Sequence, residues 1–259
     1  MQSPPSSIIF SIGGFHLHYY GLIMFFAILC AILTMRFVAK KFYKDVDTSV
    51  LLDILPPILL CAILGARIYY VALDFSYYSK HAGEIFAVWN GGISIHGALI
   101  GGILCGVWLA RKNKFSFLKY ADIFAYGLLI GQAVGRLGNY FNCEAFGKPT
   151  LLPWGLYIPE SHRPFEYYQY SYFHPTFLYE IIWNLLVFTM LILLTKKRTY
   201  PAGTVFFGYL VLYSIGRFFI EFLRIDSVLN VGIVPVAQIV CVIAAVAGVF
   251  GVIRVNRKK

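Results

Sequence analysis

The sequence has 259 residues, of which 59% are hydrophobic and 13% are charged, and its mean hydropathy is +0.71. Soluble domains carry about 25% charged residues, so these values exclude an ordinary soluble protein and predict an integral membrane protein. The formal net charge of +10 does not predict a nucleic-acid partner, because the basic residues gather at the ends of apolar segments.

Seven apolar segments follow one another along the chain, each about as long as the hydrocarbon core of a bilayer requires. They comprise residues 19–38, 50–71, 93–110, 119–134, 176–195, 204–223 and 234–253. Small residues recur at fourfold spacing, as at Gly97 and Gly101, which predicts close helix packing. The predicted fold is an all-α integral membrane protein with about seven transmembrane helices, in a single polytopic membrane domain over residues 1–259.

The basic residues predict the orientation of the chain. Fifteen of the 22 Lys and Arg residues fall within 36–49, 111–119, 196–198 and 254–259, which lie on one side of a seven-span protein. The positive-inside rule therefore predicts a multi-pass membrane protein with its N-terminus outside and its C-terminus in the cytoplasm. The segment 135–175 cannot span, and its Pro and aromatic residues predict a small outward-facing head.

His96 is the first polar residue singled out within the predicted spans, in "NGGISIHGALIGG". A lone histidine in an apolar helix is often a core residue with a satisfied hydrogen bond. The alternative is a proton acceptor, because histidine exchanges protons near neutral pH. No second histidine lies three or four residues away, so we expect no metal site.

The stretch "GRLGNYFNCEAFG", residues 135–147, carries unusual polarity for the end of a membrane segment. Arg136 and Asn139 are three residues apart and share a helix face if the helix continues. An arginine beside amide donors matches a phosphate group, because the planar guanidinium forms bidentate bonds. The alternative is a helix end with an arginine that reaches the membrane interface.

A third polar group lies in "YSIGRFFIEFLR", where Tyr213, Arg217 and Glu221 follow at four-residue spacing on one helix stripe. An intramembrane arginine costs roughly 2.5–3.5 kcal/mol on insertion scales and normally has a partner. The pair either locks helices together or holds Arg217 toward an anionic ligand. With Glu180 of "HPTFLYE" and Tyr20 of "LHYYGLI", these residues predict an outward-opening cavity for a phospholipid.

These blocks resemble the prolipoprotein diacylglyceryl transferase family over essentially the whole chain. The resemblance implies transfer of the diacylglyceryl group of phosphatidylglycerol to the lipobox cysteine of a prolipoprotein signal peptide, with glycerol phosphate released, as the first step of lipoprotein maturation. It implies that the partners are this lipid, the signal peptide and the bilayer, and that no metal or cofactor takes part.

The resemblance also assigns residues by motif. The catalytic candidates are His96, Arg217, Tyr20, Asn139 and Glu144. The candidates for binding phosphatidylglycerol are Arg136, Gly147, Tyr213, Glu180 and Glu221. We interpret Asn139, Glu144 and Glu221 as residues that orient the arginines, and His96 as the base that takes the thiol proton. The alternative is that the positive charge of the arginines promotes loss of the thiol proton without a separate base.

Two positions depart from the family pattern, Ala98 and Cys143, where relatives often have glycine. We interpret Cys143 as a neighbour of the site rather than a nucleophile. Each of three rival functions would require a sequence feature that distinguishes it from the transferase. A transporter would commonly show inverted repeats and broken helices, an intramembrane protease would need a nucleophile with a base, and a metal-dependent phospholipid transferase would need clustered aspartates.

Overall fold

The computed structural model describes residues 1–259 except 5, 14, 89–90, 226–229, 232 and 258–259. The chain divides into two compact units. The larger comprises Met1–Tyr43 and Ala121–Lys259, and the smaller comprises Lys44–Tyr120. Each unit is described by itself below.

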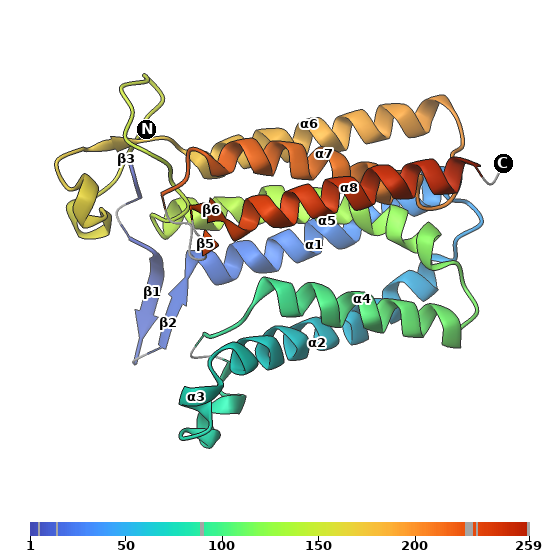
Figure 1. The fold of residues 1–259 in the computed structure, drawn as a ribbon, viewed down its shortest axis with the longest axis horizontal. Helices are drawn as coiled ribbons and strands as arrows, with labels where there is room; N and C mark the ends of the chain where they lie inside the picture. Colours follow the sequence, from blue (N-terminus) through green and yellow to red (C-terminus); the bar gives the residue numbers. More distant parts are fainter. Residues whose placement is uncertain (5, 14, 89–90, 226–229, 232, 258–259) are drawn as a thin grey trace. The chain divides into compact units, whose positions relative to one another are not determined.

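The larger unit is a bundle of long helices that run side by side (Figure 1). They are α1 (Tyr19–Phe42), α5 (Phe117–Phe141, in this unit from Ala121), α6 (Thr176–Lys197), α7 (Thr204–Glu221) and α8 (Val236–Arg257). Its core joins α1, α5, α6 and α7, where Val38, Tyr126, Leu129 and Val187 are almost fully buried. The helix α5 contributes Ala125, Tyr126 and Leu129 to this core, and its polar residues Asp122 and Asn139 are buried as well.

The smaller unit consists of α2 (Thr48–Leu73), α3 (Phe75–Tyr78), the 3-10 helix η1 (Ala82–Phe86) and α4 (Ile95–Lys112). The helices α2 and α4 pack backbone against backbone. A Cβ atom on Gly97 would overlap the carbonyl oxygen of Gly65, and one on Gly101 would overlap that of Cys61. The close packing predicted from the glycine spacing is therefore confirmed for this helix pair.

The predicted helical membrane fold is confirmed. In the described part of the chain, seven helices have 18 or more residues, and each coincides with one predicted span. Five of them, α1, α2, α6, α7 and α8, are long and apolar enough to cross a membrane. The helix α4 falls outside this set because its 18 residues include His96 and end in Arg111 and Lys112, and α5 because it carries Asp122, Gln132 and Arg136.

Short paired strands lie at one end of the larger unit (Figure 1). The described pairs are β1 (Ile8–Ile12) with β2 (Phe15–His18), β3 (Leu156–Tyr157) with β4 (Tyr172–Phe173), and β5 (Asn230–Val231) with β6 (Val234–Pro235). Two 3-10 helices, η3 (Glu160–His162) and η4 (Phe165–Tyr167), lie between β3 and β4 in the chain. The amino group of Met1 donates to the carbonyl of Gly155 over 2.7 Å, and the Tyr157 N–H donates to the Met1 carbonyl. The segment predicted as a head is thus tied to the N-terminus, around a small core of its own that includes Phe146, Leu156 and Phe173.

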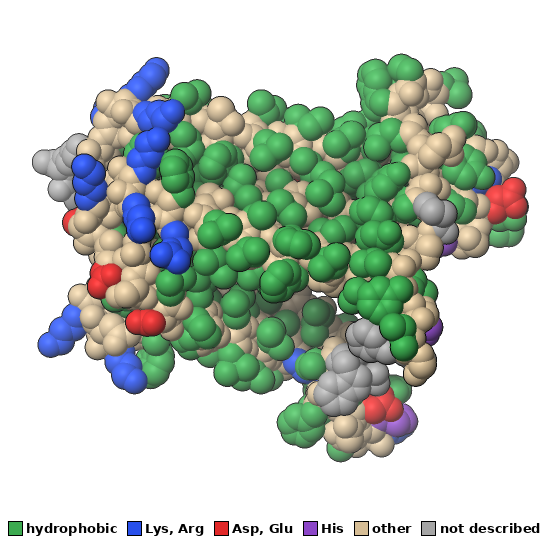
Figure 2. Space-filling model, turned by 180° about the vertical axis from the view of Figure 1, so that it is seen from behind, with side chains coloured by type: hydrophobic (Ala, Val, Ile, Leu, Met, Phe, Trp, Pro, Cys, Tyr) green, Lys and Arg blue, Asp and Glu red, His purple; other side chains and the backbone are tan. Residues whose placement is uncertain are grey.

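The surface of the larger unit separates charge from apolar residues. Hydrophobic side chains cover the flanks of the helices, and Lys and Arg side chains gather around one end of them (Figure 2). The last turns of α1, α6 and α8 supply Lys40, Lys41, Lys196, Lys197, Arg254 and Arg257. An apolar flank with a basic rim is typical of a multi-pass membrane protein, which this chain therefore is.

Asp122 on α5 caps a neighbouring helix at the basic end of the bundle. Its carboxylate accepts hydrogen bonds from the N–H groups of Gly203 at 2.8 Å and Phe206 at 2.7 Å, and it is 2% exposed. Gly203 precedes α7 and has no side chain with which to cap it. A carboxylate at a helix N-terminus pairs free N–H groups and interacts favourably with the helix dipole.

Asp122→Ala is therefore expected to lower the free energy of unfolding by about 2 kcal/mol or more, because two buried N–H groups lose their acceptor. The thermal unfolding midpoint in detergent measures the change. Asp45→Ala is the control, since Asp45 is largely exposed and pairs with Lys119 at the surface, where such pairs contribute little. Equal midpoints for the two variants would contradict the capping role.

Candidate functional site

The helix α5 continues seven residues beyond the predicted span and ends at Phe141. Arg136 and Asn139 consequently lie on one helical face, as their spacing predicts. Arg136 forms a bidentate pair with Glu180 of α6, with Nε 2.7 Å from Oε2 and Nη2 2.9 Å from Oε1. Glu180 is 2% exposed, so this is a charge pair inside the bundle, with the fork geometry that arginine and carboxylate favour.

Glu180 also serves a second arginine. Its Oε1 lies 3.5 Å from Nε of Arg217 on α7, and Arg217 pairs through Nη1 with Glu221 one turn later. Glu221 in turn lies 3.8 Å from Nε of Arg224. We call Arg136, Glu180, Arg217, Glu221 and Arg224 the ion-pair cluster. The predicted pairing of Arg217 with Glu221 is confirmed, and one buried carboxylate joins the two predicted phosphate-binding arginines.

The other polar residues of the stretch 135–147, called the signature stretch below, extend this cluster by further hydrogen bonds. Nη1 of Arg136 donates to Oδ1 of Asn139 over 3.2 Å, and Nδ2 of Asn139 donates to Oε1 of Glu144 over 2.9 Å. Asn142 also donates to Glu144, over 3.4 Å. The side chain of Arg136 is 27% exposed, and among described residues two of its five N–H groups have no acceptor. Those donors are available for a ligand.

The chain after α5 takes an unusual backbone conformation. Cys143 has a φ of 52° and Ala145 a φ of 53°, both in the left-handed region. This region favours glycine because it crowds the Cβ atom of other residues. A glycine at position 143, which the family resemblance leads one to expect, would adopt this conformation without strain. Burial raises the pKa of the Cys143 thiol, which disfavours the thiolate that a nucleophile requires.

Cys143→Gly and Cys143→Ala form a matched pair that separates these effects. Both remove the thiol, so both are expected to keep turnover within about threefold of wild type if Cys143 takes no part in the reaction. The glycine variant is expected to be more stable than the alanine variant by about 1 kcal/mol, because only glycine relieves the positive φ. Initial rates and thermal midpoints measure the two effects. A large loss of turnover in both variants would instead assign the thiol a chemical role.

Gly147 lies where three segments meet. Its N–H donates to the carbonyl of His174 over 2.8 Å, and it bridges to Arg224. A Cβ atom at this position would lie 2.6 Å from the carbonyl oxygen of Leu223 and 2.8 Å from Cγ2 of Thr176. Gly147 thus brings the start of α6 and the end of α7 close to the signature stretch, and its lack of a side chain is a packing requirement of the site.

The two predicted tyrosines contact the site in different ways. Tyr20, at the start of α1, lies over Gly138, where a Cβ atom would be 2.7 Å from its ring. Its hydroxyl also lies close enough to Glu144 and Arg136 to interact with both charges. Tyr213 lies one turn before Arg217, stacks on Tyr209 with ring centres 5.6 Å apart, and packs against the buried core of the larger unit. It borders the ion-pair cluster on the cytoplasmic side of the predicted topology.

Two amides form a polar layer one turn from Arg136 and Glu180. The spacing in the sequence points to Asn184, whereas it was not used to single out Gln132. Gln132 precedes Arg136 by one turn, and its amide donates to the Tyr209 hydroxyl over 3.0 Å. Asn184 follows Glu180 by one turn and is 1% exposed. Because α5 and α6 are antiparallel, these two amides lie at one depth. Their spacing from Arg136 and Glu180 is the sequence signal for them.

His96 belongs to the smaller unit, at the second residue of α4. It is partly exposed, and its ring centre lies 6.0 Å from that of Tyr69 on α2. Nine of the ten predicted site residues therefore lie in the larger unit, and the remaining one lies in the smaller. Among the residues that the structure describes, no group of three or more His, Cys, Asp or Glu side chains is arranged to hold a metal ion.

The arrangement in the larger unit can bind an anion. Two guanidinium groups share one buried carboxylate, so an arriving phosphate would find fixed donors and would compete with Glu180 for them. Low polarity around the cluster strengthens such interactions. The site is therefore suited to an anionic group carried by a molecule that enters from lipid.

Comparison with known proteins identifies the family. Residues 7–254 match the family model described as prolipoprotein diacylglyceryl transferase. A protein of Nostoc sp. is 43% identical over 252 residues, which cover 95% of this chain and 88% of that protein, and it is named phosphatidylglycerol–prolipoprotein diacylglyceryl transferase. Proteins with the same name from Synechocystis sp. and Thermosynechococcus vestitus are each 41% identical, over 96% and 98% of this chain and 89% and 93% of their own lengths. The chain thus belongs to the prolipoprotein diacylglyceryl transferase family.

Proposed function

We propose that this protein transfers the diacylglyceryl group of phosphatidylglycerol to the lipobox cysteine of a prolipoprotein signal peptide, as the first step of lipoprotein maturation. The observation that carries this proposal is the sharing of Glu180 by Arg136 and Arg217 inside a bundle of membrane-type helices. Two fixed positive groups match one phosphate, and the surrounding bilayer matches the acyl chains. The names of the relatives support the same reaction.

The chemical step is a displacement at carbon. The cysteine sulfur attacks the glyceryl carbon that bears the phosphate, and a carbon–sulfur bond forms as the carbon–oxygen bond breaks. The electron pair leaves on the phosphate oxygen, so glycerol phosphate is released with the additional negative charge. Arg136 and Arg217 stabilise that charge, and electrostatic stabilisation of this kind is usually the largest contribution to catalysis.

The neighbouring residues keep the arginines in place. Asn139 and Glu144 hold Arg136 from the signature stretch, and Glu221 holds Arg217 from the next turn of α7. We assign Glu180, Gly147, Tyr213 and Tyr20 to the wall of the phosphatidylglycerol site, because each contacts or borders the residues that carry the two arginines. Residues held by such partners lose less freedom when the substrate binds.

We assign His96 the role of the base that accepts the proton of the cysteine thiol. A free thiol has a pKa of about 8.5, so at neutral pH most of it is protonated and a base raises the thiolate fraction. Histidine is the side chain best suited to this exchange.

His96→Gln tests this role through the pH profile. The variant is expected to lower turnover at pH 6–8 by about 10²-fold, the usual contribution of a general base. Its remaining rate should rise about tenfold per pH unit below about pH 8.5, because only the thiol itself then ionises. Initial rates of peptide lipidation over this range measure it. Near-full turnover of the variant across pH 6–8 would remove the base role.

We place the protein in the bacterial cytoplasmic membrane, with its N-terminus outside and its C-terminus inside. The basic last turns of α1, α6 and α8 support this orientation (Figure 2), because cytoplasmic ends carry the excess of Lys and Arg. The ion-pair cluster lies toward the opposite ends of α6 and α7 and would then face the side to which precursors are exported.

The reaction is tested with purified protein in detergent, phosphatidylglycerol and a synthetic lipobox peptide. Mass spectrometry is expected to detect a diacylglyceryl group on the peptide cysteine, and a peptide with serine at that position is expected to remain unchanged. Phosphatidylethanolamine in place of phosphatidylglycerol serves as the lipid control. Transfer to the serine peptide, or none to the cysteine peptide by folded protein, would overturn the proposal.

A further inference from the structure

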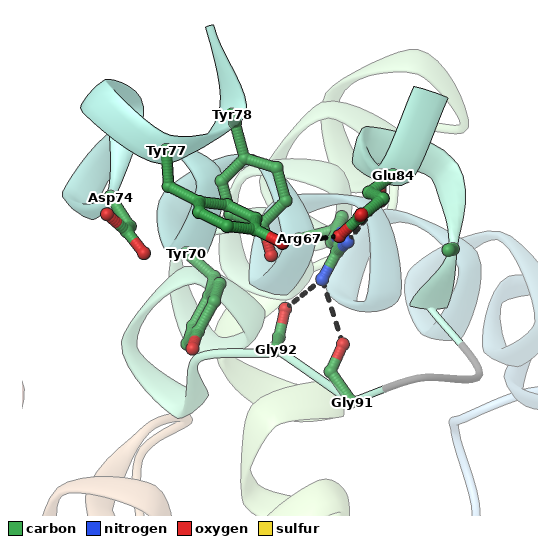
Figure 3. Close-up of a pocket in the computed structure, with 9 residues that line it drawn as sticks. Arg67, Tyr70, Asp74, Tyr77, Tyr78, Glu84, Gly91 and Gly92 are labelled. Carbon is green, nitrogen blue, oxygen red and sulfur yellow. Dashed lines mark hydrogen bonds between the residues drawn. The ribbon is translucent and has the colours of Figure 1, made fainter. Parts of the chain in front are cut away.

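Arg67 on α2 is a buried arginine to which the proposed reaction assigns no task. It is 7% exposed. Its Nη2 donates to the carbonyl of Glu84 over 2.6 Å, and its Nη1 donates to the carbonyls of Gly91 and Gly92 over 2.8 and 2.7 Å (Figure 3). Its Nε donates to the carbonyl of Ile85 over 2.8 Å. One guanidinium thus holds two separate parts of the segment between α2 and α4.

Its charge is balanced by dipoles rather than by a carboxylate. In the described part of the chain, no acidic group lies within ion-pair distance of Arg67, and the carboxylate of Glu84 accepts from the Tyr77 hydroxyl over 3.0 Å instead. The guanidinium centre also lies 5.1 Å from the ring centre of Tyr78. Four carbonyl oxygens and an aromatic face compensate a buried cation, so Arg67 is committed to holding backbone.

The glycines that receive Arg67 are required for the contact. Gly91 and Gly92 have φ values of 86° and 69°, a region that strains other residues. A Cβ atom on Gly92 would lie 2.5 Å from Nη1 of Arg67 and 2.9 Å from Cε1 of Tyr70. A side chain at position 92 would therefore collide with Arg67 and Tyr70, two of the residues that line the pocket of about 280 Å³ shown in Figure 3.

The held segment leads directly into His96. The Ser94 N–H donates over 3.1 Å to the carbonyl of Ala66, the residue before Arg67, and α4 begins at Ile95. On the other side of His96, Gly97 packs against the backbone of Gly65. The first turn of α4 is thus attached to α2 both before and after His96, and Arg67 supplies most of the hydrogen bonds on the preceding side.

We propose that Arg67 is a positioning residue, which fixes the Gly91–Gly92 segment and through it the placement of the His96 imidazole. This inference rests on the proposed role of His96 as base. A base must lie within hydrogen-bond reach of its proton, and a displacement of about 1 Å can cost about 10²-fold in rate. Four bonds from one rigid side chain limit such displacement.

Three variants test the inference in the full-length protein. Arg67→Gln removes the charge and the fork, Arg67→Lys keeps the charge without the fork, and Gly92→Ala disturbs the same contact from its other side. Arg163→Gln is the matched control, because Arg163 also donates to backbone carbonyls, of Ile158 and Tyr168, and lies over the ring of Tyr157. All are compared with His96→Gln by hydrogen exchange and by steady-state kinetics.

Amides of residues 91–98 are expected to exchange about tenfold faster in the Arg67 and Gly92 variants than in wild type or the Arg163 control. Turnover is expected to fall about 10–10²-fold, with Arg67→Lys the least impaired, while the KM for phosphatidylglycerol stays within about twofold because the ion-pair cluster is untouched. A smaller folded fraction would also lower turnover with an unchanged KM, so turnover is normalised to the folded fraction of each variant. Faster exchange confined to residues 91–98 then distinguishes local displacement from general unfolding.

Unchanged exchange at 91–98 would overturn the attachment itself. Faster exchange with unchanged turnover would overturn the positioning role. Failure of the proposed role of His96 is detected separately, in His96→Gln. Wild-type turnover in that variant would show that His96 is not the base, and Arg67 would then have no base to position, whatever the Arg67 variants show. A pH profile of Arg67→Lys that keeps the wild-type shape at lower amplitude supports displacement rather than loss of the base.

Discussion

Arg136→Ala is expected to lower the rate of peptide lipidation by about 10²–10³-fold, the usual effect of removing one group that stabilises a developing negative charge. The guanidinium is held by a bidentate pair with Glu180 and by Asn139, so its position is fixed before the lipid arrives. Arg136→Lys should fall between the two, because a lysine keeps the charge but not the planar fork. Initial rates at saturating phosphatidylglycerol measure the effect.

The control for this prediction is Arg163→Ala, which removes another arginine of the larger unit that does not contact the ion-pair cluster. Its rate is expected to stay within about threefold of wild type, since it touches no group assigned to the reaction. Circular dichroism and the thermal midpoint establish that each variant is folded. A folded Arg136→Ala variant with a near-normal rate would contradict the assignment of Arg136 to the phosphate.

Glu180→Gln is expected to have the largest effect on stability. The carboxylate is 2% exposed and contacts both Arg136 and Arg217, so its neutralisation leaves two neighbouring guanidinium groups without their shared counter-charge. Breaking a buried ion pair by removing one partner costs about 3–5 kcal/mol, which corresponds to a fall of about 10 °C in the thermal midpoint for a chain of this size. Thermal unfolding in detergent measures this change.

The matched control is Glu160→Gln. Glu160 also lies near an arginine, Arg163, at 4.0 Å, but its side chain is 66% exposed, and exposed pairs contribute little. Its midpoint should remain close to that of wild type. If the two variants had equal midpoints, Glu180 would not be the charge that holds the cluster together.

Much of the fold was predictable because hydrophobicity dominates it. Seven apolar segments gave seven helices, since a bilayer span needs an uninterrupted apolar run and little else. The predicted span stops at residue 134, where the apolar run ends, and the sequence leaves open whether the helix continues; it does, to Phe141. The helix continues to Phe141 since the charge of Arg136 meets Glu180, a partner on another helix that hydropathy does not register.

The site was predictable where partners are close in sequence. Arg217 and Glu221 are one turn apart, so their pairing followed from helical geometry. The link from Arg136 to Glu180 crosses 44 residues, and no local pattern specifies which intramembrane carboxylate meets which arginine. Arg67 is a charge within the predicted span 50–71, but its acceptors are backbone carbonyls, which every residue has and which therefore leave no sequence signal.

The left-handed conformation of Cys143 was equally hidden in this one sequence, because cysteine gives no indication of a positive φ. The family resemblance marks Cys143 as a departure from glycine, but it does not by itself predict a positive φ. At such a position the local preference of non-glycine residues for negative φ is overridden by the geometry that the site requires.

The most direct test of the whole account follows the two halves of the lipid. Folded wild-type protein is given a lipobox peptide and phosphatidylglycerol labelled with deuterium in the acyl chains and with carbon-13 in the headgroup glycerol. The account predicts that the peptide cysteine gains all of the deuterium and none of the carbon-13, which appears as glycerol phosphate in equal amount. Carbon-13 on the peptide, or an unmodified peptide with an intact thiol, would contradict the transfer and the arginine-bound phosphate on which it depends.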